Sequence, residues 1–466
     1  MHKNRVIRTL LNTLKKIPII PINPGSDNFF SLHLSIIIIN YNVKYFLEQC
    51  LCAIHKAIEH FNAEVWVVDN ASTDGSIGYL KPMFPWVKFT ENAENVGFAK
   101  ANNQALLQCA GKYVLFLNPD TLISEDSLTK CIAFLQKEQK AGALGVRMID
   151  GSGTFLPESK RSFPSPLTSF YKLTGISRLF PSSKIFSRYS LAYLNEFENH
   201  EVDVLSGAFM LARKDILLDL NGFDEDFFMY GEDIDLSYRI QKLGYKNFYF
   251  SESTIIHFKG ESTRKGSLRY IKMFYQAMSI FVKKHYAGRS ARVLRLFIQT
   301  AILLRAGVSA IITKVSLKAL IPSANAANTT VKLKRVKAQA EKQYLTIIAG
   351  SEDEYDEVKN LLANAGLKAW ITGRASANGQ CGNAFCTVDD LPSFVRNNSV
   401  ERIIFCHGEL QYSDIIKRFQ DLPNNISVRF HTRGTRSIVG SNSKDTTGEC
   451  IYANTGFEIE RDITSL

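Results

Sequence analysis

Polar and acidic residues follow three apolar runs of this 466-residue chain, at the point where each run ends. Asn40 and Tyr41 follow LSIIII, Asp69 ends AEVWVVD, and Asn118 and Asp120 follow YVLFL. Short β-rich apolar runs predict buried strands, so these polar residues are expected at strand ends. Carboxylate oxygens placed there can hold a divalent cation or accept a hydrogen bond from a ligand. One such ending would be an ordinary loop, but three indicate a single site.

The segments that carry these residues alternate between strand and helix. Strand patterns at 34–40, 63–70, 86–92 and 112–120 are separated by helical patterns near 46–59 and 99–108. This alternation predicts an α/β fold with a parallel sheet, in which ligands bind at the carboxyl ends of the strands. No glycine-rich turn follows the first strand, where the chain reads YNVKYFLEQC. Its absence argues against classical NAD binding and leaves another nucleotide open.

A second group of acids lies in GEDID, at residues 231–235. Glu232 and Asp233 are expected at the first turn of a helix, where negative charge is favoured, so a capping role is one interpretation. The other is a general base, because a carboxylate in a half-apolar pocket can take the proton of an acceptor hydroxyl. Asp235 is expected to pair with Arg239 on the same helix. His257 ends the strand STIIH, where an imidazole is either structural or completes the shell of a metal ion.

Seven motifs, taken in order, resemble the successive motifs of family 2 glycosyltransferases with the GT-A fold, particularly the rhamnosyltransferase-like branch. They are SIIIINYN, VVDNASTDGS, ENVGFAKANNQAL, LFLNPDT, SGAFMLARKDIL, GFDEDFFMYGEDIDLSYRIQKLGYK and IIHFKGEST. The resemblance covers about residues 34–290. DNASTDGS or NPD alone is a weak signal, but the order and spacing of the whole set are specific.

The resemblance implies a nucleotide-sugar donor site at the strand ends. Asp69 resembles the base-contacting aspartate of the family, and a carboxylate accepts the imide N–H of uracil or thymine, which suits UDP or dTDP donors. Glycine at position 97 would allow a close approach of backbone to the donor. The donor-binding residues that the resemblance implies are Tyr41, Asp69, Asn95, Gly97, Asn102 and Asn118.

The resemblance also implies a metal and a general base. Asp120 and His257 are expected to hold Mg²⁺ or Mn²⁺ against the donor diphosphate. The family's DxD-like motif carries a first acid that is Asn118 here, which leaves a single carboxylate. Asp233 is expected as the catalytic base, with Glu232 as its supporting or acceptor-binding neighbour.

Two functions follow from these assignments. The first is an inverting glycosyltransferase that transfers a sugar from a UDP- or dTDP-sugar to a glycan or polyprenyl-linked acceptor in bacterial cell-surface polysaccharide synthesis. The second is a non-catalytic nucleotide-sugar-binding scaffold that supports a partner transferase. Together, Asp69, Asp120, Asp233 and His257 favour the enzyme.

The positive charge of the chain is concentrated in one strip. The net charge is +11, but residues 259–342 hold 18 Lys and Arg and only two acids, which leaves the rest of the chain net acidic. This localisation argues against a nucleic-acid binder and for an anionic partner, either a phospholipid surface or a phosphate-bearing substrate. Lys259, Arg264 and Lys265 are expected to close over the diphosphate. An amphipathic helix near 292–315 either lies in a membrane interface or packs on the protein.

The remaining features concern compartment and domain organisation. Eight scattered cysteines are expected to be free thiols, and the basic N-terminus lacks the pattern of a signal peptide. We therefore expect a cytoplasmic protein, peripheral on the inner face of the cell membrane. The predicted segments are a basic N-terminus (1–33), a GT-A domain (34–290), a basic helix and linker (291–342) and a smaller Rossmann-like α/β domain (343–466) that serves as a regulatory or docking module.

Overall fold

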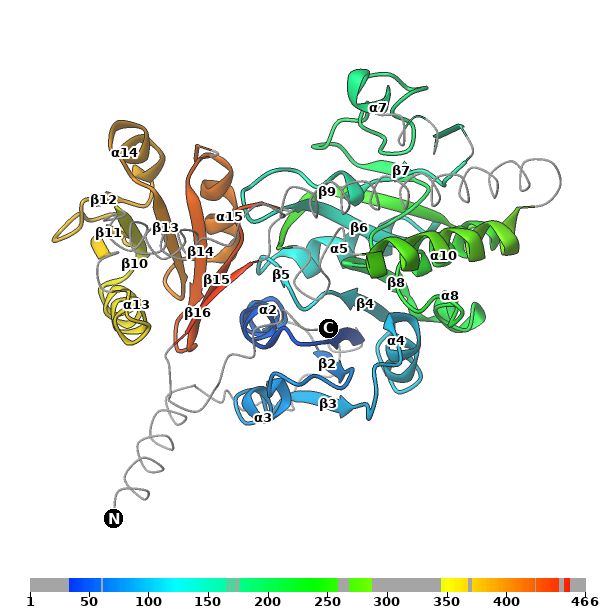
Figure 1. Cartoon of the computed structure of the whole chain (residues 1–466), viewed down its shortest axis with the longest axis horizontal. Helices are drawn as coiled ribbons and strands as arrows, with labels where there is room; N and C mark the ends of the chain where they lie inside the picture. The colour runs from blue at the N-terminus through cyan, green and yellow to red at the C-terminus, as the bar shows by residue number, and fades with distance from the viewer. Residues whose placement is uncertain are drawn as a thin grey trace, which may run out of the picture.

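The computed structural model describes two mixed α/β regions (Figure 1). The described residues are 33–59, 62–165, 167–168, 171, 176–258, 268–286, 345–367, 371–423, 425–443 and 448–452. The N-terminal segment, the helix predicted near 292–315, the linker and the basic residues 259, 264 and 265 lie outside these ranges. Among the described helices, none combines the length and apolar character needed to cross a membrane.

The first sheet has the order β3-β2-β1-β4-β8-β6-β9-β5, and β7 pairs with β9. Its strands are β1 (His33–Asn40), β2 (Asn62–Asp69), β3 (Val87–Glu91), β4 (Tyr113–Leu117), β5 (Thr121–Leu122), β6 (Ala141–Ile149), β7 (His200–Val202), β8 (Phe209–Arg213) and β9 (Lys246–His257). The first four run parallel, as the sequence predicts, but β8 pairs antiparallel with both β4 and β6. The sheet is therefore mixed.

The helices of this region lie on the two faces of the sheet and at its edge (Figure 1). They are α2 (Lys44–Ala57), α3 (Ser76–Leu80), α4 (Phe98–Leu106), α5 (Ser127–Lys137), α7 (Ile176–Leu179), α8 (Lys214–Asp219), α9 (Glu232–Lys242) and α10 (Leu268–His285), with a short 3₁₀ helix η1 at Pro157–Ser159. Residues Ile36 and Ile38 of β1 belong to one buried cluster, and Ile37 and Ile39 belong to the other. Because successive side chains of a strand point to opposite faces, a strand buried on both sides needs the uninterrupted apolar run seen here.

The second sheet has the order β12-β11-β10-β13-β14-β15-β16. Its elements are β10 (Thr346–Gly350), α13 (Glu352–Asn364), β11 (Ile371–Ser376), β12 (Cys386–Thr387), α14 (Leu391–Asn397), β13 (Arg402–His407), α15 (Tyr412–Gln420), β14 (Ser427–Thr432), β15 (Ser437–Gly440) and β16 (Glu449–Tyr452). The strands from β12 to β14 are parallel, which agrees with the predicted Rossmann-like region, and β15 and β16 add an antiparallel edge.

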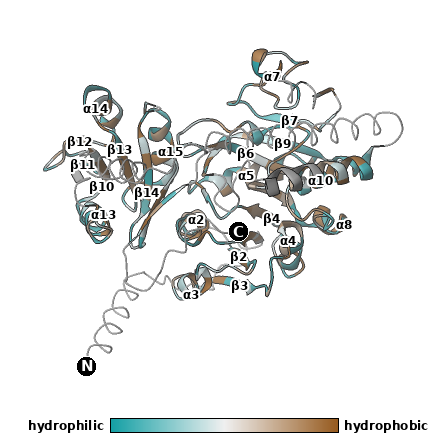
Figure 2. Cartoon of the chain, viewed as in Figure 1, coloured by the Kyte–Doolittle hydropathy of each residue, from teal (hydrophilic) through white to brown (hydrophobic). Residues whose placement is uncertain are grey.

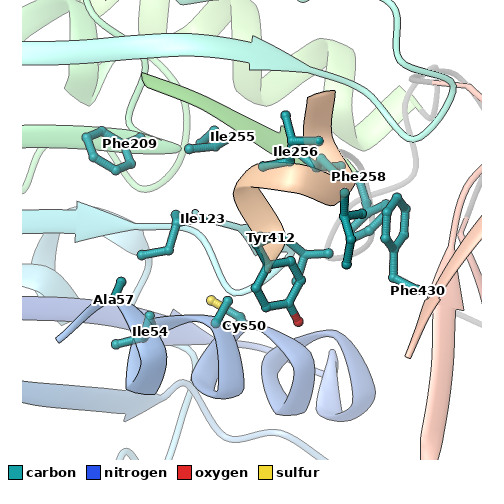
Figure 3. Close-up of a cluster of buried hydrophobic side chains, with 14 of the residues drawn as sticks. Cys50, Ile54, Ala57, Ile123, Phe209, Ile255, Ile256, Phe258, Tyr412 and Phe430 are labelled. Atoms are coloured by element: carbon teal, nitrogen blue, oxygen red, sulfur yellow. The ribbon is translucent and has the colours of Figure 1, made fainter. Parts of the chain in front are cut away.

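The two sheets share one hydrophobic core. Figure 3 shows Tyr412 of the second region beside Cys50 of α2, and Phe258 facing Phe430 of β14. The ring of Phe258 lies between Phe46 and Phe430, with centroid distances of 5.2 and 5.6 Å. All of these side chains are buried. The C-terminal region is therefore packed on the first sheet as part of the same core.

Buried polar contacts fix the same interface. On α2, the Gln49 amide donates to Thr435 Oγ1 at 2.8 Å and to the carbonyl of Ser437 at 3.2 Å. The neighbouring Glu48 accepts hydrogen bonds from the Ser437 hydroxyl and from the backbone N–H of Arg436. Burial raises the pKa of Glu48, and these hydrogen bonds act in the opposite direction. Losing either partner would leave a buried polar group unsatisfied, so the contacts fix one docking position.

A second polar contact joins the loop after β5 to the start of α15. The carboxylate of Glu125 accepts the backbone N–H of Tyr412 at 2.6 Å and of Ser413 at 3.1 Å. His407 Nε2 lies 3.3 Å from the same carboxylate. Burial favours the neutral acid, but the hydrogen bonds from His407 and the two N–H groups outweigh it and lower the pKa of Glu125 to about 2. Glu125 therefore binds the second region mainly as an anion.

We expect Glu125→Gln to destabilise the whole chain at neutral pH, by about 1–2 kcal/mol, because a charged acceptor is lost at a buried interface. The pKa of Glu125 is lowered on folding, so its contribution is present above about pH 4.5 and is lost as the pH falls toward 2. The difference in melting temperature between wild type and variant should therefore narrow from pH 7 to pH 4. Glu409→Gln, an exposed change in the neighbouring loop, is the control. An equal difference at both pH values would contradict the ionic role.

Candidate functional site

The ends of β1 and β2 bring Asn40 and Asp69 together. The two residues are register partners in the parallel pair, and the Asn40 amide donates to Asp69 Oδ1 at 2.6 Å. The backbone N–H of Ser72 donates to Asp69 Oδ2 at 2.9 Å. Asp69 is buried, and Tyr41 beside it is half-buried. Each carboxylate oxygen retains a free lone pair after these contacts, so Asp69 is held in place and can still accept a ligand N–H.

The segment before α4 packs against the segment before α9. Gly97 has φ +88°, and a Cβ placed on it would lie 2.6 Å from the carbonyl oxygen of Phe228. The next residue, Phe98, donates its backbone N–H to that same oxygen at 2.8 Å. In the structure it is the backbone of Phe228 that lies close to Gly97, and a close approach of the donor stays a prediction. Asn95 supports the turn by accepting the Gly97 N–H at 3.0 Å.

Asn102 lies inside the fold. Its side chain is buried and donates to the carbonyl of Phe98, one turn earlier in α4, at 2.9 Å. Its Oδ1 atom is buried and makes no hydrogen bond with the described residues. This buried acceptor can be satisfied by a ligand or by water.

Asp120 and His257 meet at the start of β5. Thr121 and His257 are partners in the antiparallel β5–β9 pair, and His257 Nε2 lies 3.4 Å from Asp120 Oδ1. Asn118 Nδ2 is 3.3 Å from the same imidazole nitrogen. Both Asp120 and His257 are buried, and the Nδ1 atom of His257 makes no hydrogen bond with the described residues. The predicted metal residues are therefore adjacent, and Asn118 borders them.

These residues fit a divalent ion only as part of its shell. A carboxylate oxygen and an imidazole nitrogen face each other; the carboxylate is a suitable ligand for Mg²⁺ or Mn²⁺, whereas the imidazole suits Mn²⁺ better than Mg²⁺. In the described ranges, no group of three or more His, Cys, Asp or Glu is arranged to hold a metal. The remaining ligands would have to come from a diphosphate and from water, which Mg²⁺ normally retains.

The second region holds this pair in place through Phe258. The backbone N–H of Phe258 donates to the carbonyl of Asp120 at 3.0 Å, while its own carbonyl accepts from Ser441 at 3.4 Å. Its ring contacts Phe46 and Phe430. The residue after His257 is thus bonded to Asp120 on one side and packed against β14 on the other. Sequence motifs gave no indication of this support.

Asp233 is bound by an arginine that the sequence analysis missed. Arg161 Nη2 lies 2.5 Å from Asp233 Oδ2 and also donates to the carbonyl of Leu205 at 2.8 Å. The N–H of Gly207 lies 3.4 Å from the same Oδ2 atom, and the other oxygen accepts the N–H of Ile234 at 2.8 Å. Arg161 belongs to residues 155–200, a segment rich in aromatic residues, Pro and Ser that matches none of the seven motifs, so the sequence KRSF indicates only its charge.

One short backbone segment connects the two acidic positions. The N–H of Asn118 donates to the carbonyl of Ala208 at 3.0 Å, and Gly207, the preceding residue, contacts Asp233. Residues 206–208 therefore run from the Asp120–His257 pair to the first turn of α9. The structure brings Asn118, Asp120 and His257 into contact and places Asp233 at the other end of this link.

Glu232 and Asp235 differ sharply in their surroundings. Asp235 pairs with Arg239 at 2.6 Å, as predicted, and also lies 2.5 Å from His285 Nε2. Glu232 begins α9 after Gly231, is buried, and leaves Oε2 without a hydrogen bond among the described residues. Burial and, to a smaller extent, the charge of Asp233 raise the pKa of Glu232 to about 8. At neutral pH Glu232 is therefore mainly a neutral acid.

We expect Glu232→Gln to be more stabilising at pH 8 than at pH 5. The pKa of Glu232 rises on folding from 4.5 to about 8, so the folded chain keeps a proton that the unfolded chain releases. Wild type therefore loses stability as the pH rises through this window, whereas glutamine does not titrate. Melting temperatures of both proteins at pH 5 and pH 8 measure the effect, with the exposed Glu94→Gln as control. A constant difference would show that Glu232 is ionised in the folded chain.

Comparisons with known proteins connect the first part of the chain to a family. A family model described as glycosyl transferase family 2 matches residues 35–220. An N-acetylglucosaminyl-diphospho-decaprenol L-rhamnosyltransferase of Mycobacterium tuberculosis is 27% identical over 283 residues, which cover 58% of this chain and 91% of that protein. The rhamnosyltransferase WbbL of Escherichia coli K12 is 30% identical over 179 residues, 36% of this chain and 63% of WbbL.

Solved structures give weaker similarities. The mannosyltransferase PcManGT of Pyrobaculum calidifontis, solved with GDP-Man and Mn²⁺, has a TM-score of 0.39 and 19% identity, covering 70% of this chain and 87% of its own. Residues 1–349 of S. aureus TarS give 0.37 and 18%, covering 59% and 71%. These scores are too low to support an argument about function. Residues 35–220 nevertheless match glycosyl transferase family 2, and this match, together with the similar rhamnosyltransferases, identifies the chain as a glycosyltransferase.

Proposed function

We propose that this glycosyltransferase inverts the configuration of a sugar that it moves from a UDP- or dTDP-sugar to a glycan or polyprenyl-linked acceptor. The observation that carries the proposal is the short link from the Asp120–His257 pair, through residues 206–208, to Asp233. The Asp120–His257 end of this link suits a diphosphate leaving group, and the Asp233 end suits the removal of a proton. A reaction at one anomeric carbon needs both groups within reach of the same substrate.

The names of the similar proteins support the proposed acceptor and the proposed donor sugar. The M. tuberculosis relative is named for a decaprenol-linked acceptor and for L-rhamnose, and this chain spans 91% of its length. For this chain we propose the same class of acceptor, one linked to a polyprenol, and a donor that carries rhamnose or another hexose. Bacterial cell-surface polysaccharide synthesis is the corresponding process.

On the donor side, the buried Asp69 accepts the imide N–H of uracil or thymine with the lone pairs that Asn40 and Ser72 leave free. Asp120 and His257 would hold Mg²⁺ or Mn²⁺, which neutralises the charge of the departing diphosphate. Asn118, Asn95 and the turn at Gly97 border this donor site in the proposal. Replacement of the first acid of the motif by Asn118 means that the carboxylate of Asp120 acts together with substrate oxygens.

On the acceptor side, a carboxylate oxygen of Asp233 takes the proton of the acceptor hydroxyl. As the hydroxyl oxygen forms a bond to the anomeric carbon, the bond from this carbon to the nucleoside diphosphate breaks on the opposite face, which inverts the configuration. Arg161 orients Asp233 through Oδ2. The neutral Glu232 beside it can donate a hydrogen bond to the acceptor, in agreement with a supporting role.

We further propose that the protein is peripheral on the cytoplasmic face of the membrane. The basic strip at 259–342 supports attraction to anionic lipid, because positive charges near such a surface each contribute about 1 kcal/mol. Lys259, Arg264 and Lys265 of this strip are also suited to the donor diphosphate. These three residues and most of the strip lie outside the described ranges, so the proposal rests on the sequence alone.

The substitutions Asp120→Asn and Asp233→Asn should separate binding from chemistry. Asparagine at position 120 keeps nearly the same size, so the fold should persist while the metal-dependent part of UDP or dTDP affinity is lost together with most of the activity.

The Asp233→Asn variant should bind donor nearly as wild type does but transfer about 10²- to 10⁴-fold more slowly, the usual cost of losing a general base. Calorimetry of UDP and dTDP with and without Mn²⁺ measures the first effect, and release of nucleotide from a panel of UDP- and dTDP-sugars with a polyprenyl-linked acceptor measures the second.

Each variant is the control for the other, because Asp120→Asn should lose metal-dependent donor binding and Asp233→Asn should keep it. Equal metal-dependent binding by wild type and Asp120→Asn would leave Asp120 as a loop cap. Near-normal turnover by Asp233→Asn would remove Asp233 from the role of base. If wild type binds nucleotide but transfers no sugar from any donor, the proposed reaction is wrong and the scaffold predicted as the alternative is favoured.

A further inference from the structure

Residues 176–191, which we call the α7 lobe, expose both apolar and basic side chains. The exposed fractions are 74% for Leu179, 53% for Phe180 and 63% for Ile185. The exposed basic residues of the lobe are Arg178, Lys184 and Arg188. No Asp or Glu occurs anywhere from residue 162 to residue 195. Figure 1 shows α7 at the edge of the catalytic domain, beyond β7, and Figure 2 shows apolar positions on it.

The exposed apolar residues are presented by an ordered turn. The hydroxyl of Ser183 accepts the backbone N–H of Ile185 at 3.3 Å and of Phe186 at 3.2 Å. The hydroxyl of Ser187 donates toward the carbonyl of Pro181 at 2.6 Å. The ring of Phe180 contacts Phe186 with a centroid distance of 5.4 Å. These contacts hold Phe180 and Ile185 on the outside of the turn, so their exposure belongs to the folded conformation.

The lobe is attached to the catalytic domain beside Asp233. The ammonium of Lys160 is directed inward, to the carbonyls of Leu191 at 2.9 Å and Leu194 at 2.6 Å. Ser162 donates its N–H to the carbonyl of Tyr189 at 2.9 Å. Arg161, between these two residues, is the partner of Asp233. The end of the lobe is therefore hydrogen-bonded to the two residues on either side of Arg161, the partner of the proposed base.

Three kinds of partner can be compared for this surface. A second copy of the lobe would bring like charges together, which is unfavourable at an interface without acids. A nucleic acid would pair with the basic residues and could stack a base on Phe180, but it would leave the aliphatic Leu179 and Ile185 without a partner. The interface of an anionic bilayer takes both kinds of residue, because apolar side chains enter the headgroup boundary while Lys and Arg remain at headgroup level.

We propose that the α7 lobe inserts Leu179, Phe180 and Ile185 into the surface of an anionic phospholipid membrane, with Arg178, Lys184 and Arg188 on the headgroups. This contact is separate from the basic strip at 259–342 and lies in the catalytic domain itself. The contact rests on the proposed function in one respect, because a lipid-linked acceptor would reach Asp233 from the membrane surface that the lobe contacts. The insertion itself does not depend on the reaction.

The direct test is a tryptophan reporter in the full chain. In Phe180→Trp, vesicles of phosphatidylcholine and phosphatidylglycerol with brominated acyl chains should quench the new fluorescence beyond the quenching seen in wild type. Leu107→Trp, at an exposed apolar position at the end of α4, is the matched control and should not be quenched. Vesicles of phosphatidylcholine alone should give much weaker quenching, because the basic residues then lack a partner.

A second variant measures the contribution of the lobe to binding. Combined replacement of Leu179, Phe180 and Ile185 by Ser should weaken vesicle binding by more than about tenfold, since each buried apolar side chain adds favourable transfer free energy. Release of nucleotide without vesicles should remain as in wild type, so the test is independent of the reaction. If Phe180→Trp binds vesicles without quenching of its new tryptophan, the proposal is overturned and binding is assigned to the basic strip. Loss of a dimer in the triple variant, without quenching in Phe180→Trp, would overturn it in favour of self-association.

Discussion

The packing of one phenylalanine connects the two halves of this protein to its chemistry. Phe258 follows His257 directly, bonds through its N–H to the carbonyl of Asp120, and places its ring between Phe46 of α2 and Phe430 of β14. The two residues proposed to hold the metal therefore lie at the β5–β9 strand pair, Asp120 just before β5 and His257 at the end of β9, and the C-terminal region packs against this pair. Replacing a buried phenylalanine of this kind by alanine typically costs about 3–5 kcal/mol, so the arrangement is strongly favoured over a loose one.

This dependence explains how a site with one carboxylate can still be well defined. Asp120 and His257 offer too few ligands to enclose a divalent ion, so the substrate must complete the shell. Such a site benefits from protein groups that need no rearrangement when the donor arrives. The shared core provides that rigidity, and the link through residues 206–208 extends it to Asp233. We infer that the C-terminal region supports the proposed donor site, whereas the regulatory or docking module that its sequence pattern indicates stays a prediction.

Local patterns in the sequence predicted the parts of the site that depend on local structure. The apolar runs before Asp69 and Asp120 are strands because they are buried on both faces, and the strand ends coincide because β1, β2 and β4 are parallel neighbours. The start of α9 at Glu232 and the Asp235–Arg239 pair follow from helical spacing. The second α/β region is likewise predicted by its alternation of strand and helix patterns, and the structure contains a second α/β sheet there.

Contacts between distant segments could not be predicted in this way. Arg161 lies 72 residues before Asp233 in a segment without a recognisable motif, so nothing in its sequence neighbourhood indicates its partner. The apolar faces of α2 and β14 resemble those of any buried element, and their pairing across the linker has no local signal. The antiparallel β8 contradicts simple βαβ alternation because tertiary pairing, not its own pattern, sets its direction. Gly97 was recognised as special, but only the fold shows that Phe228 is the group that approaches it.

Hydrogen exchange in a Phe430→Ala variant tests most directly whether the C-terminal region supports the donor site. We expect faster exchange in peptides that cover residues 118–122 and 254–258, because the ring of Phe258 loses one of its two aromatic neighbours. Mn²⁺-dependent binding of UDP or dTDP should become weaker as well. Phe385→Ala, an exposed change in the same region, should leave both unchanged. If β14 exchanges faster in Phe430→Ala but these two segments do not, the C-terminal region does not support the donor site.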